Sequence, residues 1–117
     1  MIVKNNSKQH EIKQNMRGGK GDIKITHITD QEVLGKHCRL FAQITVKPGD
    51  SIGDHQHVGE QEIFYFIKGS GIAIDNGRQS DIGPGDVMVT PDQGSHSVIN
   101  TGDQDLVFIA LILKEDA

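Results

Sequence analysis

The stretch that decides the fold is 47-KPGDSIGDHQHVGEQEIFYFIKG-69. It carries two histidines two positions apart, His55 and His57, and a glutamate, Glu62, that opens a run of apolar and aromatic residues. Alternate residues of a β-strand project from the same face, so both imidazoles are expected on one side of one strand. The four residues between His57 and Glu62 include a glycine and are short enough for a hairpin loop. The returning strand 62–69 would then bring Glu62 beside the histidines.

A third histidine, His96, follows the turn-like segment 91-PDQGS-95 and opens a predicted strand over 96–100. Three imidazole nitrogens and one carboxylate oxygen suit a first-row divalent ion. Structural zinc sites are usually rich in thiolates, and the chain has a single cysteine, Cys38. An ion that prefers six ligands would keep open positions for Lewis-acid or redox chemistry. We expect one divalent metal ion, manganese first, with Fe, Ni, Co, Cu or Zn as alternatives, and these ligands: His55, His57, Glu62 and His96.

The rest of the chain is a series of short apolar segments separated by turn signals, which favours an all-β sandwich or barrel. Residues 1–21 are mostly polar and are expected to form an N-terminal arm, followed by one β-barrel domain over 22–117. Asn76-Gly77 predicts a two-residue hairpin turn. A loop or helical turn is expected over 29–36, and strands over 22–28, 38–46, 71–75, 78–82, 87–90 and 105–113.

Alternation along the strands predicts which side chains line the interior. If Glu62 points inward, so do Phe64 and Phe66, while the outward residues are Ile63, Tyr65 and Ile67. That apolar outer face should be covered by a second sheet or a second subunit, so a homodimer is expected. The nearly continuous apolar segment 105–113 is expected to be buried on both faces, with Phe108, Ala110 and Ile112 on one of them. Either Gln43 or Ile44 lines the cavity.

These residues resemble the two motifs of the cupin family. The first motif is a glycine, five residues, His-x-His, four residues, Glu, six residues and a glycine, and here Gly49, His55, His57, Glu62 and Gly69 keep every spacing. The second is a glycine, five residues, Pro-x-Gly, two residues, His, three residues and Asn, which Gly85, Pro91, His96 and Asn100 match. Gln93 departs from the motif, because it stands where the internal glycine belongs. The resemblance covers at least residues 40–113.

The resemblance implies the cupin double-stranded β-helix, a jelly-roll barrel of six to eight antiparallel strands, with the metal bound in its open mouth. The chain is similar to small single-domain bacterial cupins of the cupin_2 type, some of which are labelled oxalate-decarboxylase-like. Oxalate decarboxylases themselves have two domains and an arginine three residues before the first ligand histidine. This chain has one domain's length and Ile52 at that position.

The charge and composition of the chain limit the classes of partner that it can bind. The formal net charge of −4 over 117 residues offers no basic field for nucleic acid, so no nucleic-acid partner is expected. No apolar stretch approaches the length of a signal peptide or a membrane span, so no membrane partner is expected. A single cysteine forms no internal disulfide and fits a reducing cytoplasm, which is the expected location.

Two functions follow from the sequence. One is a metalloenzyme, such as a decarboxylase, dioxygenase or isomerase, that acts on a small carboxylate or oxygenated molecule. The other is a non-catalytic module that binds or senses a small molecule or the metal. Glu60, which has the strand parity of Glu62, is the candidate general acid or base, against the alternative of a solvated loop carboxylate. Arg17 and Lys20 could hold an anion near the mouth or belong to the arm, and Asn100 is expected to stabilise a turn. The remaining histidines are expected at the surface: His10, His27 and His37.

Overall fold

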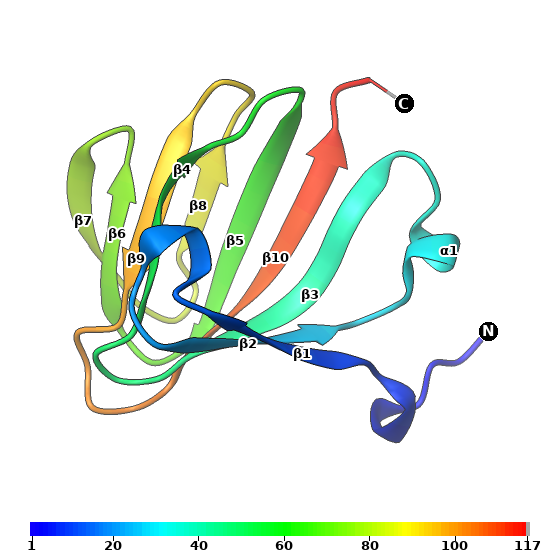
Figure 1. The fold of residues 1–117 in the computed structure, drawn as a ribbon, viewed down its shortest axis with the longest axis horizontal. Helices are drawn as coiled ribbons and strands as arrows, with labels where there is room; N and C mark the ends of the chain where they lie inside the picture. The colour runs from blue at the N-terminus through cyan, green and yellow to red at the C-terminus, as the bar shows by residue number, and fades with distance from the viewer. Residues whose placement is uncertain (117) are drawn as a thin grey trace.

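A computed structural model describes residues 1–116, which form ten strands in two antiparallel sheets that face each other (Figure 1). In order across the six-stranded sheet lie β1 (His10–Gln14), β2 (Asp22–His27), β3 (Cys38–Val46), β10 (Leu106–Lys114), β5 (Glu60–Lys68) and β8 (Val87–Thr90). The four-stranded sheet has the order β4 (Ser51–Gln56), β9 (Ser95–Ile99), β6 (Gly71–Asp75) and β7 (Arg78–Ile82). The helical elements are short: η1 (Asn5–Ser7), η2 (Met16–Gly18) and α1 (Gln31–Leu34).

This arrangement confirms the expected all-β jelly roll and corrects two of its details. Over the described part of the chain the two sheets share no hydrogen-bonded strand pair, so they form an open sandwich rather than a closed barrel. The strands number ten rather than six to eight, because β1 and β2 extend one edge of the larger sheet. Among the described residues, no helix has the length and hydropathy needed to cross a membrane.

The core lies between the inner faces of the two sheets. On β5, Phe64 and Phe66 are buried, while Tyr65 and Ile67 on the opposite face are 48% and 41% exposed, which confirms the predicted alternation. The rings of Phe64, Phe66 and Phe108 contact one another at the centre of the core. Such aromatic contacts stabilise the fold beyond the contribution that burial of the rings makes.

The prediction that residues 105–113 are buried on both faces is wrong. Along β10, fully buried residues alternate with half-buried ones, and the buried set is Leu106, Phe108, Ala110 and Ile112. The other face belongs to the outer surface of the six-stranded sheet, which no second layer formed by residues 1–116 covers. A run of apolar residues can therefore mark one buried face and one partly exposed face rather than two buried faces.

The N-terminal segment differs from the expected arm. Residues 10–14 form β1, which pairs with β2 from His10↔Thr26 to Gln14↔Asp22. All five β1 residues are exposed, so backbone hydrogen bonds rather than apolar burial hold this edge strand. Polar composition alone could not reveal such a strand. The division of the chain at residues 21 and 22 into an arm and a domain stays a prediction.

The predicted hairpin between the two histidines and Glu62 is also corrected. Strand β4 pairs with β9, and β5 pairs with β10 and β8, so the chain crosses from one sheet to the other between them. The short loop is compatible with both connections, and only the long-range pairing decides between them. The Asn76-Gly77 hairpin is confirmed, with φ of 48° and 83° at these residues between the paired strands β6 and β7.

Candidate metal centre

Four side chains, three from strands and one from the loop that follows β4, meet between the sheets. His55 lies near the end of β4, and His57 follows one residue after that strand ends. His96 lies on β9 directly opposite His55 in the strand register, and Glu62 faces them from β5 in the other sheet. The structure therefore brings together all four residues that the sequence predicted as a metal site.

The ligand atoms of these residues form a tight cluster in which all of them lie within 4.8 Å of one another. The Nε2 atom of His96 is 3.0 Å from Nε2 of His57 and 3.1 Å from Nε2 of His55. One carboxylate oxygen of Glu62, Oε1, lies 2.9 Å from Nε2 of His57 and 3.1 Å from Nε2 of His96. Three nitrogens and one oxygen thus converge on a common point, as ligands of a single ion must.

The opposite ring nitrogens of the histidines are all engaged, which fixes how the rings face the cluster. Nδ1 of His55 donates to the carbonyl oxygen of Gly53 at 2.8 Å, and Nδ1 of His57 donates to a carboxylate oxygen of Glu60 at 2.7 Å. A carbonyl and an ionised carboxylate can only accept, so in the neutral rings Nδ1 carries the proton and Nε2 keeps a free lone pair. Nδ1 of His96 lies 2.7 Å from the hydroxyl oxygen of Thr90, which can accept in the same way. The set fits a divalent metal ion, because bound histidines commonly have this outer support.

The cluster is buried and electrically coupled. His57, Glu62 and His96 are each less than 5% exposed, and the ring of Phe64 stacks on His96 with centroids 4.8 Å apart. Burial lowers the pKa of His55, while the hydrogen bond to Glu62 raises the pKa of His57. Burial acts to raise the pKa of Glu62, but the hydrogen bonds that His57 and His96 donate from Nε2 when their rings are protonated outweigh it and leave that pKa lowered. Glu62 is therefore an anion that faces three imidazoles, which is the charge state a cation needs.

Glu60, the candidate catalytic residue, has two partners. Its carboxylate accepts two hydrogen bonds of 2.8 Å from the guanidinium of Arg39 and one from His57. The bond to Arg39 is the main cause that lowers the pKa of Glu60 to about 2. A carboxylate that is ionised and bonded in this way holds the ring of His57 in place. Its predicted role as a general acid or base stays a prediction.

A cavity of about 510 Å³ opens over the histidines. Its apolar wall includes Ile44 and Phe64, which answers the open choice between Gln43 and Ile44 in favour of Ile44. Charged and polar residues of β1 and of the segment around η2 form the rest of the wall, among them Lys13 and Arg17. The cavity thus has a polar rim over an apolar interior, which is the usual composition of a small-molecule site.

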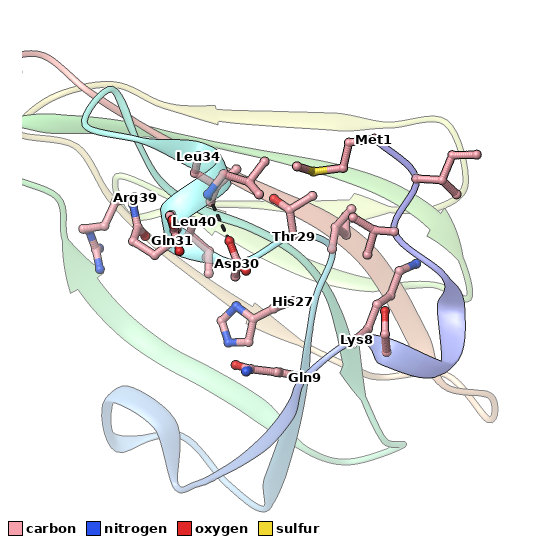
Figure 2. A pocket seen from close by; sticks show the side chains of 16 residues that line it. Met1, Lys8, Gln9, His27, Thr29, Asp30, Gln31, Leu34, Arg39 and Leu40 are labelled. Carbon is pink, nitrogen blue, oxygen red and sulfur yellow. Dashed lines mark hydrogen bonds between the residues drawn. The ribbon is translucent and has the colours of Figure 1, made fainter.

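A second hollow of about 720 Å³ lies between the N-terminal segment, the start of α1 and β3 (Figure 2). It is larger, but it contains no part of the histidine cluster and shares only His27, Arg39 and Leu40 with the first cavity. Within residues 1–116, the one buried side-chain polar atom without a hydrogen-bond partner, Oγ1 of Thr29, lies in this region. We place the functional site at the cluster, because donor chemistry identifies a site and size alone does not.

The other histidines stay outside the cluster, as expected. His10 contacts the hydroxyl of Thr26 at 2.9 Å, and His27 pairs with Glu11 at 3.0 Å. Asn100 is 1% exposed and makes two hydrogen bonds within its loop, to Gly102 and Gln104, and one to Val46 at the end of β3, so its predicted turn-stabilising role is confirmed.

Gln93, the residue that departs from the cupin motif, keeps the turn that a glycine would make. Its φ is 75°, in the left-handed region that glycine adopts most easily. Its backbone N–H donates to the carbonyl of His57 at 2.7 Å, and the N–H of His57 donates to the carbonyl of Gly94 at 2.9 Å. The turn therefore holds the backbone of a candidate ligand in place despite the substitution.

Sequence reasoning missed the partners of the histidine rings. Thr90 and Gly53 touch His96 and His55 through single atoms, and Arg39 reaches Glu60 from a distant strand. Strand alternation could have indicated the inward position of Thr90, because Thr90 lies two residues after the buried Met88 on β8 and so projects from the same face. The contact of Arg39 has no local signal.

Comparison with known proteins agrees with this geometry. The family model described as the Cupin domain matches residues 42–112. The oxalate-binding protein of Thermotoga maritima is 42% identical over 113 residues, which cover 97% of this chain and 93% of that protein.

Among solved structures, a predicted oxalate decarboxylase from Thermotoga maritima has a TM-score of 0.92 at 42% identity, with 97% of this chain and 99% of that chain covered. KdgF from Halomonas sp. has a TM-score of 0.69 at 20% identity, with 99% and 96% covered, and shows a shared fold. The two motifs, the jelly roll and these matches lead to one conclusion: this chain belongs to the cupin family.

Proposed function

We propose that the chain binds one divalent metal ion through His55, His57, Glu62 and His96 and uses it to bind a small carboxylate of the oxalate class. The observation that carries the proposal is the convergence of four ligand atoms within 4.8 Å at the base of a cavity. The carboxylate class is supported by the oxalate-binding protein of Thermotoga maritima, whose sequence aligns along nearly the whole chain.

Each part of the site has a task in this proposal. A bound divalent ion supplies a Lewis acid that attracts carboxylate oxygens. The residues behind the cluster, Gly53, Glu60 and Thr90, hold the imidazole rings so that Nε2 faces inward. The apolar wall around Ile44 and Phe64 excludes water, which strengthens charge interactions inside the cavity.

Binding without turnover is the function we favour, and catalysis is the second candidate. A decarboxylase activity is supported by the solved structure of a predicted oxalate decarboxylase at 42% identity, and dioxygenase and isomerase activities are the other reactions considered. Such a reaction needs a group that can give or take a proton near the substrate. Glu60 is the candidate, but its pKa of about 2 and its bonds to Arg39 make it a weak base at neutral pH. That engagement is why we place binding first.

Three finer features belong to the same proposal. Manganese is the proposed ion, with Fe, Ni, Co, Cu and Zn as alternatives that the same donors accept. A homodimer is proposed because exposed apolar residues gather on the outer face of β5 and β8, namely Tyr65, Ile67, Val87 and Val89. A cytoplasmic location is proposed because the single cysteine, Cys38, is unpaired.

The test is calorimetric titration of sodium oxalate into three preparations of the protein: loaded with Mn²⁺, stripped with a chelator, and carrying His96→Ala. Oxalate binding that requires the metal and the histidine supports the proposal. Equal binding by the stripped protein would refute the metal's role. Analysis of the loaded sample for formate and carbon dioxide then separates the two candidates, since only an enzyme of the decarboxylase type releases them.

A further inference from the structure

Besides its metal cluster, the cavity holds a cation that the proposed function does not use. Of the cationic side chains that line it, Arg39 is engaged by Glu60, whereas Lys13 and Arg17 have no ion-pair or side-chain hydrogen-bond partner within residues 1–116. Of these two, Arg17 belongs to the loop that packs against β4, the strand that bears His55, and it lines the same cavity as His55 and Glu62.

The backbone of Arg17 is held in a conformation that arginine rarely adopts. Its φ and ψ are 56° and 30°, in the left-handed region, and its neighbour Asn15 has φ of 49°. Such a conformation is strained for a non-glycine residue. It persists here because the loop closes on itself, through hydrogen bonds from Asn15 N–H to the carbonyl of Gly21 at 2.9 Å and from Gly18 N–H to the carbonyl of Asn15 at 3.0 Å. Strain of this kind is concentrated at functional sites.

The same loop is fixed against the strand that bears His55. Lys20 and Ser51 exchange hydrogen bonds of 2.9 Å, and the backbones of the loop and of β4 come so close that a Cβ atom on Gly53 would overlap the carbonyl oxygen of Arg17. Gly53 is also the residue whose carbonyl oxygen accepts from Nδ1 of His55. In Figure 1 the blue loop that carries η2 lies beside β4 and β9. The backbone of Arg17 thus packs against Gly53, and the ring of His55 bonds to the carbonyl of the same residue.

We propose that Arg17 binds the part of the carboxylate ligand that the metal cluster cannot engage, so that the site selects small dianions such as oxalate. The inference rests on the proposed function. A dicarboxylate has four oxygens and two negative charges, and the oxygens that do not contact the ion need a second partner. The guanidinium of Arg17 offers a planar fork that matches a pair of carboxylate oxygens. The chain thus supplies its cation from the N-terminal loop, while position 52 is the buried Ile52.

Oxalate titration of four proteins loaded with Mn²⁺ tests this assignment: wild type, Arg17→Gln, Arg17→Lys and Lys20→Gln. Lys20 is the matched control, because it lies in the same loop, has the same charge and does not line the cavity. Arg17→Gln should weaken oxalate binding about tenfold to hundredfold, the range expected for charge-assisted hydrogen bonds. Arg17→Lys should be intermediate, and Lys20→Gln should stay close to wild type. Mn²⁺ affinity should not fall in Arg17→Gln, because the substitution removes a positive charge.

Each other result overturns the assignment. Oxalate affinity that is unchanged in Arg17→Gln would show that Arg17 does not contact the ligand. An equal loss in Lys20→Gln would show a general charge effect instead of a contact. A parallel loss of Mn²⁺ binding in Arg17→Gln would place the effect on the metal cluster. Wild-type protein that holds Mn²⁺ and binds no oxalate would refute the proposed function itself, a failure distinct from the other three.

Discussion

The support that Thr90 gives to His96 leads to a sharp prediction. Thr90 and His96 are 0% and 1% exposed, and the hydroxyl oxygen of Thr90 lies 2.7 Å from Nδ1 of His96. Thr90→Val keeps the shape of the side chain and removes the hydroxyl. It leaves a buried ring nitrogen without a partner, which should cost about 1–3 kcal/mol of stability in the metal-free protein. It also frees the ring to rotate or change tautomer, which should weaken metal binding about tenfold to hundredfold.

A second substitution separates the two effects. Thr90→Ser keeps the hydroxyl and removes a buried methyl group, at a cost of about 1 kcal/mol in stability. It should therefore lose stability in urea denaturation but keep nearly wild-type affinity for Mn²⁺ in competition with a chelator. Thr90→Val should lose both. Metal affinity that stays at the wild-type level in Thr90→Val, or falls equally in both variants, would refute the claim that the hydroxyl positions His96.

Three further predictions follow from other contacts. Asn100→Ala should lower the free energy of unfolding, measured by urea denaturation, by about 2–4 kcal/mol, because it removes three hydrogen bonds of a buried side chain. A loss below about 0.5 kcal/mol would contradict the structural role of Asn100. Arg39→Gln should raise the pKa of Glu60 from about 2 toward its ordinary 4.5. A carboxyl whose pKa is lowered by folding stabilises the protein above its unfolded-state pKa, and this stability is lost as the pH falls. Metal-free Arg39→Gln should therefore be less stable than wild type at neutral pH, and its free energy of unfolding should fall less steeply between about pH 4.5 and 2. A fall parallel to that of wild type would contradict the pairing of Arg39 with Glu60. Val89→Lys places a charge on the exposed apolar face of β8 and should convert the proposed dimer to a monomer, as measured by light scattering. The control Lys24→Ala, on the exposed face of β2, should leave the dimer intact. A dimer in both variants would place the interface elsewhere.

Much of the fold and site follows from short-range regularities of the sequence. Alternation along β5 gives the inward set Phe64 and Phe66 because a strand turns successive side chains to opposite faces. Asn76-Gly77 predicts its hairpin because both residues tolerate positive φ. The spacing of the histidines and Glu62 predicts the cluster, even though the expected connection between them, a hairpin, was wrong.

What the sequence does not predict depends on long-range contacts. The crossover between β4 and β5 is decided by which strands pair with them, and no local pattern encodes that choice. β1 was missed because its residues are all exposed and it is held by backbone hydrogen bonds. The partners Arg39 and Thr90 were missed for a related reason, since each contact joins side chains from different parts of the fold.

The most direct test of the central claim is metal analysis by inductively coupled plasma mass spectrometry, on protein purified without an affinity tag or chelator. We predict about one divalent ion per chain, as the one set of four donors found within residues 1–116 requires, and Mn, the ion proposed above, in excess of the other metals. The variant His55→Ala/His57→Ala should contain almost none and should melt at a lower temperature, because a bound ion stabilises the folded state. A wild-type protein that stays free of metal after reconstitution, or a double variant with unchanged metal content, would contradict the account.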